Sequence, residues 1–388
     1  MESEGSGPPT PRPTRIAIFM ADLSGGGAER MMVHLANGLS AQGIRVDLLL
    51  AKAAGPYLES VSKEIDIREV SPTGGVSRAL PYLAGYLRNE RPDLLISTLH
   101  HASLVALAAR RLSGRRIPVI IREANTPSKR IRSLARPKDL LSDELARLGY
   151  RFADGIVAVS QGVADDLARH FRLPREKLEV LHNPVVTEDI LTLANRPADH
   201  PWLEPGQPPV ILGMGRLHVQ KDFATLIRAF ARVRESREAR LLILGEGEER
   251  ERLERLAGSL GLAAEVELPG FVENPFAYLA RADLFVLSSQ WEGLPGALIQ
   301  ALACGCPVVS TDCRSGPAEV LEGGRYGELV PVGEPDLLAA AMVRALDSPI
   351  DEQCLVARSR DFSGQVVVPG YIDYFSRQLA ASRRRGQQ

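Results

Sequence analysis

Two cations stand just after an apolar stretch that predicts a strand. Arg216 and Lys221 follow Val210–Met214, and a helical pattern begins at Asp222. A guanidinium binds phosphate oxygens in bidentate fashion, and an ammonium acts as a point charge. The helix dipole opposes a lysine at a helix start, which weakens the alternative of two ordinary surface cations. We therefore predict that Arg216 and Lys221 hold a diphosphate and stabilise the charge that develops on it as it leaves.

A carboxylate follows a second predicted strand, Leu284–Ser288. Glu292 precedes Gly293 and Leu294, and a carboxylate beside exposed glycine backbone can bind the hydroxyl groups of a sugar. Seven residues separate Glu292 from Gln300. Because this spacing is about two helical turns, we expect the Gln300 side chain to project from the same face of the helix as Glu292 would at its start. An ordinary amphipathic helix explains Gln300 equally well.

A run of glycines opens another predicted helix. Gly26 and Gly27 lie after the predicted strand Arg15–Met20 and before the helical pattern Ala28–Ala41. Bare backbone N–H groups and the helix dipole favour an anion there, although a tight turn without a ligand stays open. The chain has neither the GxGxxG spacing of dinucleotide folds nor GxxxxGK followed by Ser or Thr. Neither an NAD site nor a P-loop is therefore supported.

These residues follow strands that alternate with helices. The other strands predicted in the first half are Ile44–Leu50, Asp93–Ser97, Pro118–Ile121 and Gly155–Val159. The second half predicts strands at Val210–Met214, Arg240–Leu244, Leu284–Ser288 and Pro307–Ser310, with helices at Asp222–Arg234, Glu248–Leu260 and Pro295–Ala303. Such alternation is typical of parallel sheets. We therefore predict an α/β protein with two doubly wound domains.

Length and composition agree with two domains. The 388 residues, 45% of them hydrophobic, are too many for one ordinary core. Five prolines within 197–209 predict an interdomain connector between an N-terminal domain, 14–196, and a C-terminal domain, 210–364. Open α/β sheets bind ligands at the carboxyl ends of their strands. We therefore expect a cleft between two facing sheets, and a connector that bends when the domains close.

Composition and the chain start exclude several classes of protein. Residues 1–13 have no basic start followed by an apolar stretch, so we expect a disordered tail and a cytoplasmic protein rather than a signal peptide. No apolar run approaches the roughly 20 residues of a membrane-spanning helix. The cysteines form no CxxC pair, and we expect reduced thiols without a zinc site: Cys304, Cys306, Cys313 and Cys354. The sequence has no DxD triplet and no His, Asp or Glu cluster with ligand spacing, so no metal is predicted.

Positive charge is concentrated in one segment of the first half. Residues 109–138 hold ten basic side chains and one acidic one, although the whole chain has a net charge of −1. A short helix predicted over Ser128–Arg136 carries four cations among apolar residues: Lys129, Arg130, Arg132 and Arg136. Anionic headgroups attract such an element by around 1 kcal/mol per cation, so an anionic membrane surface is a candidate partner, with a solvated face as the alternative. Nucleic acid is disfavoured because the segment has no aromatic residue to stack on bases.

Taken together, the motifs resemble a known family. Six stretches, in this order, are similar to the retaining GT-B glycosyltransferases of family four: SGGGAERMMVHLANGL, HNPV, GRLHVQKDF, ILGEGEER, GFVENP and WEGLPGALIQALACGCPVVSTDCRSGPAEVL. The resemblance runs from about Arg15 to Val332, and the last stretch is highly specific. It implies a GT-B fold with two Rossmann-like domains. It also implies transfer of a sugar from a nucleoside diphosphate sugar, expected to be a UDP-sugar, with retained anomeric configuration.

The resemblance assigns a donor site to residues of this chain. The implied donor-binding residues are Gly26, Gly27, Arg216, Lys221, Val272, Asn274, Glu292, Gly293, Leu294 and Gln300. Arg216 and Lys221 would hold the diphosphate, in place of a metal ion. The loop with Val272 and Asn274 would seat the base, and Glu292 would contact the transferred sugar. No cofactor and no side-chain nucleophile is implied, because the leaving phosphate takes the acceptor proton in a front-face substitution.

Gln300 departs from the family pattern. The family usually has a second Glu at this position, whose carboxylate accepts from both ribose hydroxyls, whereas an amide has one acceptor oxygen and two N–H donors. A lost charge-assisted hydrogen bond is worth on the order of 1.5 to 3 kcal/mol. We therefore expect donor affinity to be weakened about tenfold or more without being abolished.

Polar residues after strands of the N-terminal domain complete the expected site. The family often has a His that contacts the donor sugar, and we favour His101 over His100 for that role. Thr98 is an alternative by strand register, and a structural histidine is another. The candidates for the acceptor side, which lie after a strand, are Arg122, Glu123 and Asn125. An anionic or lipid-diphosphate acceptor would use the positive charges of residues 109–138.

The sequence thus predicts a retaining, metal-independent hexosyltransferase that acts on a glycan or lipid-linked acceptor in surface polysaccharide or glycolipid synthesis. As in family members, we expect the last segment, about Gln365–Ser382, to return to the first domain. A catalytically weak nucleotide-sugar-binding or partner subunit is the main alternative, motivated by Gln300 and by the open choice of the sugar-contacting His. A sugar-nucleotide epimerase is disfavoured, because the stretch EGLPGALIQALACG resembles transferases.

Overall fold

The structure is a computed structural model that describes residues 11–24, 26–71, 73–126, 128 and 144–387. These residues form two compact units. Unit 1 contains the chain up to Val159, then Val163–Pro184 and the C-terminal segment from Gly364. Unit 2 contains Val185–Ser363 together with Ser160–Gly162. The predicted α/β class with two doubly wound domains is confirmed.

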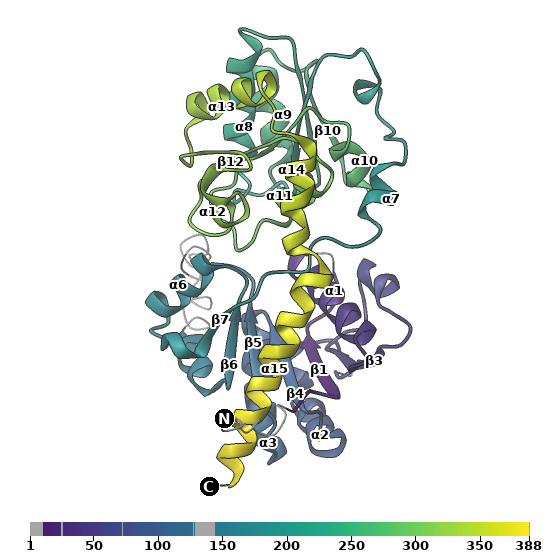
Figure 1. Ribbon diagram of the computed structural model, residues 1–388, viewed down its shortest axis with the longest axis vertical. Coiled ribbons are helices and arrows are strands. Elements are labelled where there is room, and N and C mark those ends of the chain that lie inside the picture. The colour runs from purple at the N-terminus through teal and green to yellow at the C-terminus, as the bar shows by residue number, and fades with distance from the viewer. Residues whose placement is uncertain (1–10, 25, 72, 127, 129–143, 388) are drawn as a thin grey trace, which may run out of the picture. The chain divides into compact units, whose positions relative to one another are not determined.

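Unit 1 is built on a parallel sheet in the order β3-β2-β1-β4-β5-β6-β7 (Figure 1). Its strands are β1 Arg15–Met20, β2 Arg45–Leu50, β3 Asp66–Glu69, β4 Leu94–Thr98, β5 Val119–Glu123, β6 Gly155–Ala158 and β7 Leu178–Val180. Its helices are α1 Gly27–Ala41, α2 Leu80–Glu90, α3 His100–Ser113, α6 Gln161–His170 and α15 Gly364–Gln387, with short 3₁₀ helices at Pro56–Ser60, Val76–Ala79, Tyr150–Phe152 and Arg175–Lys177.

Unit 2 has a second parallel sheet, in the order β10-β9-β8-β11-β12-β13. Its strands are β8 Val210–Met214, β9 Arg240–Leu244, β10 Val266–Gly270, β11 Leu284–Leu287, β12 Val308–Thr311 and β13 Glu328–Val330. Its helices are α7 Ile190–Ala194, α8 Phe223–Arg234, α9 Arg250–Ser259, α10 Pro275–Leu279, α11 Gly296–Ala303, α12 Pro317–Val320, α13 Pro335–Asp347 and α14 Glu352–Ser359, with 3₁₀ helices at Pro201–Leu203, Glu322–Gly324 and Arg360–Phe362.

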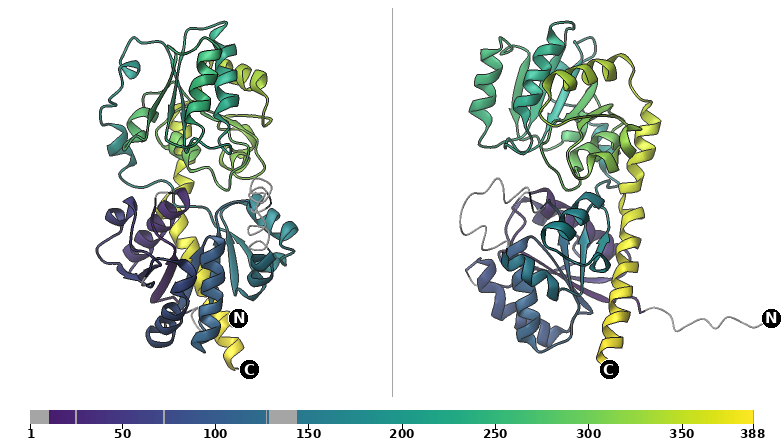
Figure 2. Two further views of the ribbon diagram at one scale, coloured as in Figure 1. Left: turned by 180° about the vertical axis from the view of Figure 1, so that it is seen from behind. Right: turned by 90° about the vertical axis from the view of Figure 1, so that its left-hand side faces the viewer.

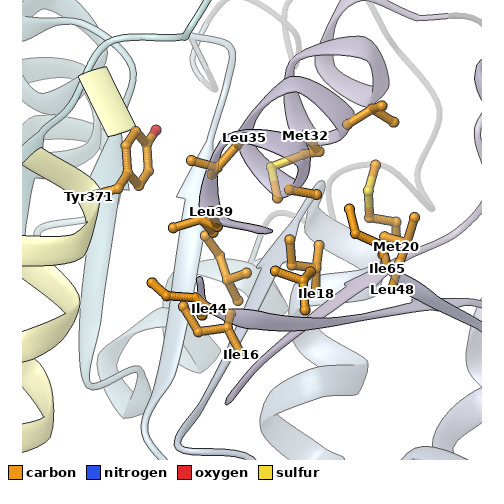
Figure 3. Close-up of a cluster of buried hydrophobic side chains, with 14 of the residues drawn as sticks. Ile16, Ile18, Met20, Met32, Leu35, Leu39, Ile44, Leu48, Ile65 and Tyr371 are labelled. Carbon is orange, nitrogen blue, oxygen red and sulfur yellow. The ribbon is translucent and has the colours of Figure 1, made fainter. Parts of the chain in front are cut away.

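The core of unit 1 joins the two ends of the chain. The apolar stripe of α1, with Leu35 and Leu39, packs on the strand residues Ile16 and Ile18. Tyr371 from α15 lies in the same buried cluster, and Figure 3 shows its ring beside the two leucines. Figure 2 shows α15 running along unit 1. The sequence predicts that about Gln365–Ser382 returns to the first domain, and α15 belongs to unit 1.

The predicted position of the connector is wrong. The chain passes from unit 1 to unit 2 between Pro184 and Val185, so residues 197–209 lie inside unit 2. They are held there by local contacts: the Tyr278 hydroxyl donates to Asp199 O at 3.1 Å, and the Arg240 guanidinium lies 4.6 Å from the Trp202 ring centroid. Prolines stop regular elements, and here they shape a packed loop of the second unit rather than a free hinge.

Candidate functional site

The two charged groups predicted from separate motifs of unit 2 meet. Lys221 precedes α8 in the loop after β8, and Glu292 lies in the loop after β11, the strand next to β8 in the sheet. The loops therefore leave the same edge of the sheet, and Lys221 Nζ lies 2.6 Å from Glu292 Oε1. Their side chains are only 18% and 9% exposed. A partly buried ion pair at the carboxyl ends of parallel strands is suited to exchanging one partner for a charged ligand.

Hydroxyl groups hold this pair from the strand ends. Ser288 Oγ donates to the backbone oxygen of Lys221 at 2.7 Å, and Ser289 Oγ donates to Glu292 Oε1 at 2.7 Å. Thr311 Oγ1, at the end of β12, donates to Ser289 O at 2.6 Å. Sequence reasoning missed these residues, although pairs of hydroxyl residues at the ends of neighbouring strands, Ser288-Ser289 and Ser310-Thr311, were a signal that could have found them.

The two site loops are also joined by hydrogen bonds to their backbone oxygens. Gln220 Nε2 donates to Trp291 O at 2.9 Å, and Gln290 N donates to Gln220 O at 2.8 Å. Asp222 caps α8 by accepting from Thr225 N and from Thr225 Oγ1. Lys221 is therefore held just outside the helix, where Glu292 balances its charge.

Arg216 is placed differently from Lys221. Its side chain is exposed and makes no hydrogen bond or ion pair to another residue that the structure describes. The backbone under it is tightly packed, because a Cβ at Gly245 would lie 2.0 Å from Gly215 O. Gly215 and Gly245 have φ of 147° and 133°. Only glycine allows the loops after β8 and β9 to approach so closely, and they present an uncompensated guanidinium at the sheet edge.

The backbone after Glu292 offers donors. Within the described part of the chain, the N–H groups of Gly293 and Leu294 donate to no partner. The carbonyl of Gly293 is fixed by Ser160 Oγ at 2.8 Å. Two N–H groups beside a carboxylate can donate to an anionic or hydroxyl oxygen that lies between them.

Gln300 lies on α11, which begins at Gly296. Glu292 precedes this helix, as the predicted helix Pro295–Ala303 placed it, and the shared face of Glu292 and Gln300 stays a prediction. The Gln300 side chain is buried and forms no hydrogen bond with any described residue. The nitrogen and oxygen of the amide are not fully covered, so this amide is available to a ligand.

The loop expected to seat the base follows β10. Phe271 is 79% exposed, and Val272 beside it is half-buried. Asn274 Nδ2 donates to Leu193 O at 2.9 Å, while its Oδ1 is buried and has no partner among the described residues. The loop thus exposes an aromatic ring, and it contains one unused acceptor that is covered in this structure.

The predicted residues of unit 1 divide into buried and exposed groups. Gly26 is the N-cap of α1 and Gly27 its first residue. His100 begins α3 with its ring buried, and its Nδ1 lies 3.6 Å from Glu123 Oε2. The next residue, His101, is exposed.

The three acceptor-side candidates do not form one exposed group. Arg122 is fully buried, and its Nη2 donates to Asn183 Oδ1. Glu123 is also buried and accepts from the Tyr150 hydroxyl at 3.0 Å. Asn125 alone among them is exposed. Asn183, of the HNPV stretch, is a buried partner that sequence reasoning did not single out.

Three further expectations concern the rest of the chain. Lys129, Arg130, Arg132 and Arg136 lie outside the described residues, as does most of the predicted N-terminal tail. Among the residues that are described, no group of His, Cys, Asp and Glu could hold a metal ion. In the same residues, no helix is long and apolar enough to span a bilayer.

Comparison with known proteins covers both units. The family described as Glycosyltransferase Family 4 matches residues 25–189, and the one described as Glycosyl transferases group 1 matches residues 208–348. A relative from Campylobacter jejuni, N-acetylgalactosamine-N,N'-diacetylbacillosaminyl-diphospho-undecaprenol 4-alpha-N-acetylgalactosaminyltransferase, is 33% identical over 82% of this chain and 86% of its own length. The lipopolysaccharide core biosynthesis glycosyltransferase LpsE of Rhizobium meliloti is 29% identical over 92% of this chain and 96% of its own.

Solved structures show the same fold at low identity. Anabaena HepE in complex with UDP-glucose has a TM-score of 0.72 at 20% identity, covering 96% of this chain and 99% of that one. The lipopolysaccharide outer core galactosyltransferase WaaB, in its apo form, has a TM-score of 0.69 at 19% identity, covering 96% and 99%. The fold is therefore GT-B. Together with the match to the Campylobacter relative over most of both chains, these findings show that the chain belongs to the group 1, family 4 glycosyltransferases.

Proposed function

We propose that this glycosyltransferase is a retaining, metal-independent hexosyltransferase that moves a sugar from a UDP-sugar to a glycan or lipid-linked acceptor in surface polysaccharide or glycolipid synthesis. The observation that carries the proposal is the contact between Lys221 and Glu292 at the carboxyl edge of the unit 2 sheet. The names of the relatives support the acceptor class, since they include a transferase acting on a diphospho-undecaprenol carrier and enzymes of lipopolysaccharide synthesis.

In the proposed reaction, the diphosphate of the donor takes Lys221 as its counterion. Arg216 has no partner among the described residues and is therefore available as a second cation. Glu292 then accepts from hydroxyl groups of the transferred sugar, while the N–H groups of Gly293 and Leu294 donate to the donor. Two positioned cations stabilise the charge on the leaving diphosphate, which is the task that a metal ion performs in other transferases.

In the same proposal, the leaving phosphate oxygen takes the proton of the attacking acceptor hydroxyl. Retention then requires attack on the face from which the diphosphate leaves, and no side-chain nucleophile. His101 is proposed to contact the donor sugar, because its ring is exposed after β4. Gly26 and Gly27 are proposed as backbone donors at the start of α1, and Asn125 as an acceptor contact.

Gln300 supports a second candidate function, a catalytically weak nucleotide-sugar-binding or partner subunit. Its unpartnered buried amide offers one acceptor where the family offers a carboxylate. Such a subunit binds the donor without releasing nucleoside diphosphate, so an assay for release separates the two functions.

The first test is a thermal-shift screen of the purified protein with UDP, GDP, ADP and their sugar conjugates, with and without chelator. A ligand at 100 times its Kd adds about 2.7 kcal/mol of stability. We expect stabilisation by the uridine compounds that chelator does not change. No shift with any nucleotide contradicts the donor site, and a shift abolished by chelator contradicts metal independence.

A peripheral position on the cytoplasmic membrane face is part of the proposal. The cations that motivate it, Lys129, Arg130, Arg132 and Arg136, lie outside the described residues. Just after them, exposed apolar side chains recur at Leu145, Leu148 and Phe152, the last 71% exposed. This spacing of three and four residues is typical of the apolar face of an interfacial helix.

A further inference from the structure

Two consecutive serines at the end of β11 each contact one partner of the Lys221–Glu292 pair. Ser288 Oγ donates to the backbone oxygen of Lys221, and Ser289 Oγ donates to the Glu292 carboxylate, each at 2.7 Å. Both serines are buried, at 1% and 0% exposure. Bulk water therefore does not compete with either hydrogen bond. A hydrogen bond to a charged group, such as that from Ser289 to the Glu292 carboxylate, is strongest away from bulk water.

Two donors to Glu292 converge on one oxygen. Lys221 Nζ lies 2.6 Å from Oε1, and Ser289 Oγ lies 2.7 Å from the same atom. When a diphosphate takes Lys221, the charged donor leaves Oε1 and the serine donor stays. A carboxylate that loses the serine donor as well is freer to follow the departing ammonium or to turn through its side-chain torsions, because a glutamate has three of them.

We propose that Ser289 is a positioning residue, which holds Glu292 in its sugar-binding orientation after Lys221 has moved to the diphosphate. This inference rests on the proposed function and names a residue through which it works. Ser289 is itself fixed, because Thr311 Oγ1 donates to its backbone oxygen at 2.6 Å. Thr311 ends β12, the neighbour of β11, so the serine is held by two adjacent strands.

A positioning role for Ser289 has a sugar-specific signature. Among the described residues, Ser289 Oγ donates to Glu292, and Glu292 is proposed to contact the sugar rather than the diphosphate. Ser289→Ala should therefore weaken binding of a sugar nucleotide and leave binding of the free nucleoside diphosphate unchanged. General damage to the loop would weaken both, because the same loop carries the N–H groups of Gly293 and Leu294.

The experiment measures Kd by calorimetry for UDP and for UDP-glucose, UDP-galactose, UDP-N-acetylglucosamine and UDP-N-acetylgalactosamine. We expect Ser289→Ala to bind UDP within twofold of wild type and the preferred UDP-sugar about tenfold more weakly. Ser359→Ala is the matched control, because Ser359 is a buried serine of unit 2 whose Oγ donates to a backbone oxygen, that of Val356, at 2.8 Å. It should bind both ligands as wild type does.

A double-mutant cycle tests whether Ser289 acts through Glu292. In a Glu292→Ala background, adding Ser289→Ala should change the Kd of the UDP-sugar by less than about twofold. Full additivity of the two substitutions, equal weakening of UDP and UDP-sugar, or unchanged sugar binding in Ser289→Ala would each overturn the proposal. A wild type that binds none of these compounds removes the proposed function itself, and this inference falls with it.

Discussion

Lys221 and Glu292, 71 residues apart in the chain, form a 2.6 Å ion pair between the loops after two neighbouring strands of unit 2. Both groups are largely buried, so each lowers the cost of taking the other out of water. A ligand that replaces one ion of this pair must carry a charge of the same sign as the ion that it replaces. A diphosphate satisfies this condition toward Lys221, and sugar hydroxyls can then satisfy Glu292.

Replacing Lys221 with Ala should reduce turnover by roughly a hundredfold or more, because the leaving diphosphate loses a preorganised cation. Initial rates of nucleoside diphosphate release measure this effect, and circular dichroism checks that the fold is intact. Lys63→Ala removes an exposed lysine of unit 1 and serves as the control. A loss of only a few fold in Lys221→Ala would refute the diphosphate assignment.

Replacing Gln300 with Glu should tighten donor binding or leave it equal. The carboxylate adds a charge-assisted acceptor for ribose hydroxyls at a buried position whose amide has no partner among the described residues. Calorimetric titration with UDP gives the Kd of both proteins. Tenfold weaker binding in Gln300→Glu would mean that the pocket requires the N–H groups of the amide.

Neutralising the basic segment should abolish binding to anionic vesicles. The variant replaces Lys129, Arg130, Arg132 and Arg136 with Gln, which removes around 1 kcal/mol of attraction per cation. Sedimentation with phosphatidylglycerol liposomes measures the bound fraction, and phosphatidylcholine liposomes give the background.

A charge-matched control for the liposome experiment lies on unit 2. It replaces four exposed arginines with Gln: Arg228, Arg252, Arg255 and Arg325. This variant should sediment with anionic liposomes as wild type does. If the variant at Lys129, Arg130, Arg132 and Arg136 also sediments as wild type does, these cations form a solvated face and do not bind the membrane.

Three of the four cysteine thiols should resist alkylation in the folded protein. Burial raises the pKa of Cys304 and of Cys313 to about 12, and it raises the pKa of Cys306 as well. The thiolate is the reactive form, so at about pH 8 these thiols are protonated as well as covered. Mass spectrometry after iodoacetamide treatment should show Cys354 modified in the folded chain and all four in urea. Modification of Cys313 without denaturant would contradict the packing of the loop after β12.

Asp93 should make the stability of unit 1 depend on pH. Partial burial raises the pKa of this carboxyl, but hydrogen bonds from Arg15 N, Thr14 N and Thr14 Oγ1 outweigh burial and hold the pKa below its ordinary 3.8. A carboxyl whose pKa is lowered by folding stabilises the folded state at pH values above its unfolded-state pKa. This contribution is lost as the pH falls through the folded-state pKa. Asp93→Asn should cost about 1 kcal/mol of unfolding free energy at neutral pH.

Urea unfolding at several pH values measures the dependence on Asp93. The difference between wild type and Asp93→Asn should be constant above about pH 5 and shrink as the carboxyl becomes protonated. A difference that stays constant at acidic pH would show that the charge of Asp93 contributes nothing.

The strands that the sequence predicts are the central ones. The strands it missed are β3, β7, β10 and β13, and all four are the edges of the two sheets. Central strands of parallel sheets are covered on both faces and appear as apolar runs. Edge strands such as Asp66–Glu69 and Glu328–Val330 are short and carry charges, so their pattern does not stand out from loops.

The sequence predicted those site residues that belong to a recognisable motif. It did not predict the contacts that depend on how the strands pack. Lys221 and Glu292 could be assigned because each follows a recognisable strand. The contact between Lys221 and Glu292 could not be predicted, because it depends on β8 and β11 being neighbours in the sheet. The same limit applies to His100 and His101, since one residue of helix rotation decides which ring is buried.

The C-terminal helix α15 completes a unit that begins at the first strand. Side chains of α15, among them Val368, Tyr371 and Phe375, fill the core of unit 1 beside α1. A nascent chain that has reached Ser363 thus holds every segment of unit 2, whereas unit 1 still lacks one wall of its core. The second domain can therefore finish folding before the first, against the usual order of vectorial synthesis. A stop codon introduced just before α15 would spare unit 2 and leave the apolar face of unit 1 open to water.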